Sequence, residues 1–215
     1  IYTTQEPSKY RSLNISFQDP MINDSPYLVG ASIFYSFRGS STNYYFPLDF
    51  TVGGAVASFG RRLEWPDDFF RVMWSAKFMQ KEYEGSQSDI DNYIGGLQKT
   101  RGISLSQVLS RDSRNRAEFP TNGSTFILEN TYSGGFLGGN ENFQKHMLTL
   151  DWFTPTFSKF VLYNSVKLGV IKTIDVGDDI QSFVPFDERF IMGGNGIPYG
   201  NALRGYPDNA IGPQT

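Results

Sequence analysis

Short segments in which every second residue is apolar follow one another along most of this chain. In residues 11–18, for example, Leu13, Ile15 and Phe17 alternate with Ser, Asn and Gln side chains. Successive side chains of a β-strand point to opposite faces of a sheet, so this period predicts a strand with one apolar and one polar face. The pattern returns at residues 28–37, 51–62, 70–83, 101–111, 124–132, 143–154 and 159–171. The sequence therefore predicts about eight strands, joined as antiparallel hairpins.

The lengths of these segments and of their connections point to a membrane. Each predicted strand has about 9–13 residues, close to the ~9–11 that a tilted strand needs to cross a bilayer. Short turns at 19–26, 63–68 and 155–158, with a somewhat longer one at 112–123, alternate with longer connections at 39–50, 84–100, 133–142 and after 172. Outer-membrane barrels show this asymmetry, with the short turns on the periplasmic side.

The two faces of the predicted strands favour the same interpretation. The polar face is mostly Ser, Gly, Asn and Thr, as in a barrel lumen, whereas a soluble sheet usually carries Lys and Glu there. Aromatic residues make up 16% of the chain, and several lie near strand ends, where membrane proteins place aromatic girdles. A soluble sandwich or a lipocalin-like barrel also alternates, and remains the alternative. We expect an all-β, transmembrane antiparallel barrel.

Charge and composition exclude several classes of protein. The net charge is -3 and the chain holds no cysteine. Because no basic stretch with interleaved aromatic residues occurs, we expect no nucleic-acid partner. The single histidine, His146, shares the parity of the apolar Leu148 and Leu150, and no nucleophile motif accompanies it. We therefore expect neither an enzyme nor a cofactor.

Acidic residues in the predicted loops raise the question of calcium. They are Asp89, Asp91, Asp175, Asp178 and Asp179. Their spacing lacks the Asp-x-Asp-x-Asp-Gly form with a closing glutamate that a calcium loop requires. Solvated acidic loops are the better interpretation, and we predict no metal site.

A stretch rich in glycine near the C-terminal end differs from the strands. It contains the pair Gly193-Gly194 and then Leu203-Arg204-Gly205-Tyr206. So many glycines allow sharp turns and close packing, which predicts a long loop that folds back and delivers a guanidinium to a chosen place. The alternative is an ordinary solvated loop in which Arg204 is a surface charge.

Four stretches, in this order, carry a resemblance to a known family. Residues 60–68 resemble a turn of Bacteroidetes-type members, and Phe119-Pro120-Thr121-Asn122-Gly123 resembles the family's periplasmic turn. Leu203–Tyr206, after the glycine pair, resembles its arginine signature, and residues 209–213 resemble the segment that follows. The chain is thus similar to the barrel of the BamA family of outer-membrane protein assembly factors. One departure is a longer spacer at residues 195–201.

The resemblance implies a place in a larger barrel. Residues 1–172 would form about strands 4 to 11 of a barrel of about sixteen strands. Residues 173–215 would form a long extracellular loop that folds inward and carries the arginine motif, in the bacterial outer membrane. In the family, this arginine meets carboxylates on strands after the loop. Glu129 and Asp151, on the inward parity, are the alternative partners within this sequence.

The resemblance also implies a function. The protein would fold and insert other outer-membrane proteins without enzymatic chemistry. Its partners would be unfolded client proteins, accessory outer-membrane lipoproteins and the lipid bilayer. A polypeptide secretion transporter of the two-partner type, or a passive channel, remains the alternative.

Overall fold

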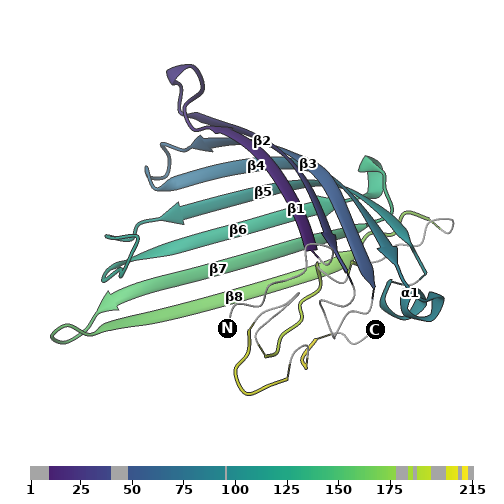
Figure 1. Ribbon diagram of the computed structural model, residues 1–215. Coiled ribbons are helices and arrows are strands. Elements are labelled where there is room, and N and C mark those ends of the chain that lie inside the picture. The colour runs from purple at the N-terminus through teal and green to yellow at the C-terminus, as the bar shows by residue number, and fades with distance from the viewer. Residues whose placement is uncertain are drawn as a thin grey trace.

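A computed structural model describes residues 10–39, 48–94, 96–177, 184–185, 188–194, 202–207 and 210–212. Eight strands form one antiparallel sheet in which each strand pairs with its neighbours in sequence, so the order is β1 to β8 (Figure 1). Their bounds are β1 Tyr10–Asp19, β2 Tyr27–Arg38, β3 Asp49–Arg62, β4 Phe70–Glu84, β5 Lys99–Asp112, β6 Gly123–Ser133, β7 Phe143–Pro155 and β8 Val161–Thr173. The predicted antiparallel sheet is confirmed, and each predicted strand lies within about two residues of the observed one.

The alternation in the sequence becomes two chemically different faces. The register pairs Leu13 with Tyr35, and Phe59 with Trp74, so apolar residues of successive strands share one face. This outer face leaves large hydrophobic side chains exposed, among them Ile15, Phe17, Ile33, Phe78, Leu105, Leu162, Leu168 and Val170. Water would penalise so much exposed apolar surface, which hydrocarbon accommodates.

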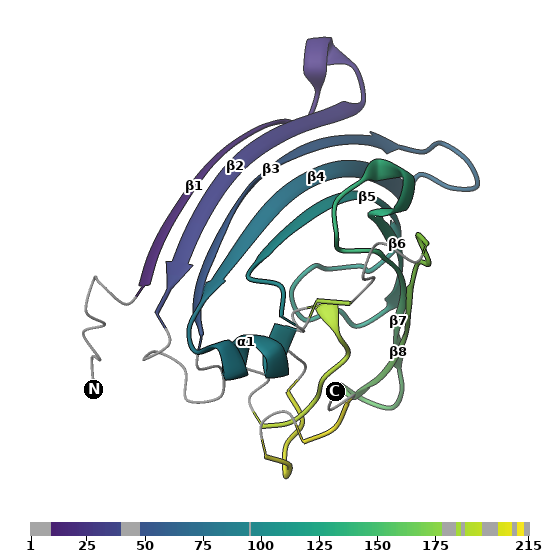
Figure 2. The ribbon, with the colours of Figure 1, turned by 90° about the vertical axis from the view of Figure 1, so that its right-hand side faces the viewer.

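Many side chains of the opposite face are small or polar. Ser106 of β5 and Thr131 of β6, for instance, share a hydrogen bond of 2.9 Å there. Figure 2 shows the sheet curved like an arch over this inner face, with β1 and β8 as its two open edges. The sheet is part of a barrel that these eight strands leave open.

The two ends of the sheet differ. The connections β1–β2, β3–β4, β5–β6 and β7–β8 lie at one end, and the other connections lie at the opposite end, which we call the loop end (Figure 1). Two short 3-10 helices, η1 (Ile22–Asp24) and η3 (Gly135–Leu137), sit in these connections. Among the described residues, no helix is long and apolar enough to cross a bilayer.

One helix departs from the expectation of a plain loop at residues 84–100. Helix α1 (Gln87–Ile94) begins after Ser86, whose Oγ accepts a hydrogen bond of 3.2 Å from the backbone N–H of Asp89. Ile90 and Ile94, one turn apart, pack into a buried cluster with Leu48 and Tyr83. The capping serine and the shared apolar side of the helix explain why a helix forms here.

Candidate functional site

The C-terminal segment brings the glycine pair and the arginine motif together. Met192 and Ile211 exchange backbone hydrogen bonds of 2.7 and 3.0 Å, and the N–H of Leu203 donates to the carbonyl of Gly194 at 3.2 Å. The Gly194 N–H donates to the carbonyl of Tyr206 at 2.8 Å. Gly193, Gly194 and Gly205 have φ values of 146, 47 and 90°, a region that favours glycine. The motif therefore sits at a turn that the glycines make possible.

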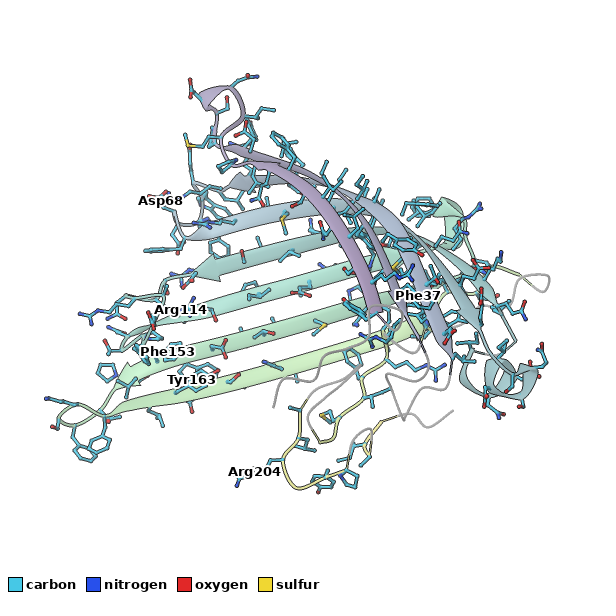
Figure 3. The ribbon with its side chains drawn as sticks, in the orientation of Figure 1. Phe37, Asp68, Arg114, Phe153, Tyr163 and Arg204 are labelled. Carbon is cyan, nitrogen blue, oxygen red and sulfur yellow. The ribbon has the colours of Figure 1, made fainter. Side chains whose placement is uncertain are left out.

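Arg204 itself is exposed at this turn. Figure 3 shows it on the part of the segment that hangs clear of the sheet. Within the described residues its guanidinium has no ion pair, and the structure brings it to neither Glu129 nor Asp151. The spacer at 195–201, Asn209 and Pro213, on which part of the resemblance rests, lie outside the described residues. The role of Arg204 stays a prediction.

Asp151 has partners of its own on the inner face. Its carboxylate accepts hydrogen bonds from the Thr125 hydroxyl at 3.0 Å and from the Tyr163 hydroxyl at 2.9 Å. The Tyr163 ring in turn stacks on Phe153, with ring centroids 4.8 Å apart (Figure 3). Glu129 also lies on the inner face, opposite Met147, and is exposed. Both carboxylates have the inward parity that the sequence predicted.

A different pair of side chains, Lys145 and Glu188, holds the C-terminal segment on the inner face of the sheet. Lys145 of β7 donates two hydrogen bonds of 2.9 Å to Glu188, one to its carboxylate and one to its backbone carbonyl. The Lys145 ammonium also lies 5.2 Å from the centre of the Phe190 ring. That ring covers Gly169 of β8 so closely that a Cβ atom there would lie 2.5 Å from it. Sequence reasoning missed these contacts, which join residues far apart in the chain.

We expect Lys145→Met in the full-length protein to release this segment. The change keeps the apolar stem but removes the charge and both hydrogen bonds to Glu188, and a charge-assisted bond contributes about 1.5–3 kcal/mol. Ile191, 3% exposed, replaced by a single cysteine, reports the release through its labelling rate with a water-soluble maleimide. We expect that rate to rise about tenfold.

Lys167→Met is the matched control for this experiment. Lys167 is also an inward-facing lysine, on the adjacent strand β8, opposite Thr149. It should leave the labelling rate at Ile191→Cys unchanged. Equal rates in both variants and in the parent would show that Lys145 does not hold the segment.

A buried ion pair fixes the connection between β6 and β7. The Lys81 ammonium of β4 lies 3.2 Å from the Glu141 carboxylate, and the two side chains are 1% and 2% exposed. The Thr100 hydroxyl donates to the same carboxylate at 2.7 Å. Gly102 leaves the space that the carboxylate fills, because a Cβ atom there would lie 2.6 Å from it. Residues 134–142 are thus pinned against β4 and β5, another feature that the sequence analysis missed.

The predicted periplasmic turn is well ordered by side chains. Asn115 accepts hydrogen bonds from the backbone N–H groups of Thr121 and Asn122, at 3.1 and 3.2 Å, and donates to the Thr121 hydroxyl at 2.8 Å. Gly123 has a φ of 103°, and a Cβ atom there would meet the carbonyl of Ser113 at 2.3 Å, so only glycine fits.

Around this turn, charged side chains form ion pairs and the aromatic side chain of Phe119 is exposed. Phe119 is 81% exposed, beside Pro120. Hydrogen bonds with the Asp112 carboxylate raise the pKa of the Arg114 guanidinium, which stays charged. Arg111 links the two neighbouring turns through a 2.8 Å ion pair with Asp67. The turn end is therefore rigid and amphipathic.

The remaining candidate residues have structural partners. The His146 ring shares a 2.8 Å hydrogen bond with Asn130 on the outer face. Asp89 and Asp91 are bound within the helix region, to Ser86 and Gln87. Asp178 and Asp179 lie outside the described residues. In the part of the chain that the structure describes, no group of three or more His, Cys, Asp or Glu side chains could hold a metal ion.

The sheet and the C-terminal segment both match a known protein family. The model of the Omp85 superfamily domain matches residues 3–215. The chain belongs to the Omp85 superfamily. Omp85 proteins are β-barrels of the outer membrane, so the exposed apolar face of β1–β8 meets lipid.

Individual relatives agree with this membership. The chain is 27% identical, over 96% of its length, to the outer membrane protein assembly factor BamA of Nitratidesulfovibrio vulgaris. The crystal structure of Haemophilus ducreyi BamA lacking POTRA domains 1–3 superimposes with a TM-score of 0.75 at 18% identity, again over 96% of this chain. This Omp85 chain spans 24% of the length of the first protein and 39% of the second. The predicted transmembrane antiparallel barrel is confirmed as the fold.

Proposed function

We propose that the full-length protein folds and inserts other proteins into the outer membrane. The observation that carries this proposal is the likeness to an assembly factor over nearly the whole chain, at 27% identity. Clients would be unfolded outer-membrane proteins, and accessory outer-membrane lipoproteins would assist. The function is non-enzymatic, because it needs a surface that templates strand pairing and a deformable bilayer rather than a reacting group.

The C-terminal segment would support this function by bracing the barrel from inside. Lys145 and Phe190 already hold its first part on β7 and β8. The turn at residues 203–206 presents Arg204 beyond that contact, where we propose that it pairs with carboxylates on other strands of the full-length barrel. A planar guanidinium suits such a pairing because it binds a carboxylate through two parallel hydrogen bonds. Residues 1–172 would then be wall strands, and 173–215 one inward loop.

Proteoliposomes containing the full-length protein test this function. We expect the wild type to accelerate the folding of an added, urea-unfolded barrel protein, and Arg204→Ala to reduce that acceleration about tenfold, the effect of losing about 1.4 kcal/mol of bracing. Arg116→Ala is the control, because Arg116 is an exposed arginine in the turn at the opposite end.

One outcome would count against the proposed function, and two would count against the bracing role of Arg204. A wild type that does not accelerate folding, yet passes a partner polypeptide or small solutes, would make the protein a secretion transporter or a channel. Retained acceleration in Arg204→Glu, whose charge is reversed, would remove the bracing role and leave the function intact. An equal loss in Arg116→Ala would show that any lost arginine has this effect.

A further inference from the structure

The outer face carries a hollow across β1 to β5. Its volume is about 560 Å³, within the ~300–1,000 Å³ of small-molecule sites. Ala31, Ala57 and Ala76 lie side by side on three adjacent strands, and Ala55 continues the floor along β3. Phe17 stands at one wall of the hollow and Phe78 at another. Four small side chains among large ones therefore leave room for an apolar chain.

A polar groove follows directly at the loop end of this hollow. Two residues beyond Phe78 on β4 lies Gln80, and two residues beyond Ile103 on β5 lies Arg101, so all four share the outer face. Gln80 and Arg101 line a second groove of about 320 Å³, together with Lys99, Thr100, Gly139 and Asn140. Gly53 of β3 lies opposite Gln80 on the same face.

The charges of the polar groove are unequal. The Lys99 ammonium lies 2.7 Å from the Glu82 carboxylate, so the two charges neutralise each other. Glu84 also lies near Lys99. Arg101 is exposed, and within the described residues its guanidinium has no hydrogen-bond or ion-pair partner. One arginine fork, beside the Gln80 amide, is thus available to an anionic group. Phosphate oxygens match a guanidinium fork through two parallel hydrogen bonds.

The groove is also held rigidly. The Asn140 side chain accepts a hydrogen bond of 2.6 Å from the Arg101 backbone N–H and donates one of 3.3 Å to the Lys99 carbonyl. On the inner side, the next residue, Glu141, is locked by Lys81 and Thr100. The wall of the polar groove is therefore pre-organised, which lowers the cost of binding.

We propose that the hollow and the neighbouring polar groove together bind one anionic, phosphate-bearing lipid. An acyl chain lies in the alanine-floored hollow, and the phosphate group contacts Arg101 at the loop end. The occupant is a lipid because the outer face of an Omp85 barrel meets the bilayer, and because the apolar hollow lies next to the Arg101 guanidinium on the same face. The site is separate from the C-terminal segment, which packs on the opposite face.

Native mass spectrometry of the full-length protein in detergent micelles tests the site. The probes are phosphatidic acid and diacylglycerol with identical chains, which differ only in the phosphate. We expect phosphatidic acid to bind at least about tenfold more tightly. Arg101→Gln should remove that preference, since it deletes the fork but keeps the backbone N–H that Asn140 binds. Ala57→Phe should weaken both lipids because it fills the hollow, and Ala76→Leu is a milder second variant.

Lys172→Gln is the matched control, because Lys172 is an exposed, outward-facing lysine near the loop end of β8, far from the hollow. It should bind both lipids as the wild type does. Equal affinity for the two probes, or an unchanged preference in Arg101→Gln, would overturn the proposal. So would full displacement of phosphatidic acid by millimolar inorganic phosphate, since that result would show a plain phosphate site without a place for the chain.

Discussion

Replacing Glu141 by alanine is expected to lower the free energy of unfolding of the full-length barrel by about 3–5 kcal/mol. The Lys81 ammonium is 1% exposed and lies 3.2 Å from this carboxylate. Removing Glu141 takes away an attraction that offsets the lost hydration of the Lys81 charge, which stays in a site of low dielectric. Thr100 would lose its hydrogen-bond acceptor as well. The loss should appear in guanidinium-induced unfolding followed by tryptophan fluorescence.

The double variant Lys81→Met/Glu141→Leu separates charge from packing. It removes both charges and keeps similar volumes, so we expect it to be more stable than Glu141→Ala, in which the Lys81 charge stays buried. Glu82→Ala is a second control, because Glu82 forms a similar pair with Lys99 at the surface, and exposed pairs contribute about 0–1 kcal/mol. If Glu141→Ala unfolds at the wild-type midpoint, the ion pair does not stabilise the fold.

The strands could be predicted from the sequence because their signal is local. Each strand of this sheet has a lipid face and a lumen face, so hydrophobicity changes with every residue. Leu148, Leu150 and Trp152 on β7 show this, with the polar Thr149 and Asp151 between them. The order of the strands also followed, since neighbours in an antiparallel meander are joined by the nearest turn.

Helix α1 was not predicted, although its signal is present. Ser86 and Asp89 have the spacing of a capping box, and Ile90 and Ile94 are one helical turn apart. Eight residues give only two turns, however, and an isolated helix of this length is marginal in water. Its stability comes from Leu48 and Tyr83, which pack against it from outside the segment. Local sequence alone does not contain that contact.

The ion pairs were missed for a related reason. Thr100 and Glu141 are 41 positions apart, and Lys145 and Glu188 are 43 apart. No sequence pattern links residues that are this many positions apart. An inward-facing lysine could also simply be solvated in the lumen, so its position does not predict an ion pair. The arginine motif illustrates the reverse case. Its residues identified the segment and its turn, but no pattern in the sequence indicates which group the Arg204 side chain contacts.

The two open edges of the sheet lead to the second large effect. Within the described residues, no strand pairs with the outer edge of β1 or of β8. Roughly half of the backbone N–H and C=O groups of an edge strand then face away from the sheet without partners. In hydrocarbon each unsatisfied group costs several kcal/mol, so the total for two edges far exceeds the ~5–15 kcal/mol by which native proteins are stable.

These 215 residues expressed alone are therefore expected not to form a stable monomeric membrane protein. Electrophoresis of unheated and heated samples, with size-exclusion chromatography in detergent, checks this. The full-length protein should show a faster-migrating folded band that heating abolishes, and the isolated chain should show aggregates without such a band. Edge pairing between copies would appear as oligomers. A monodisperse, heat-modifiable monomer of the isolated chain would contradict the prediction, because it would mean that this half-open wall closes its own edges.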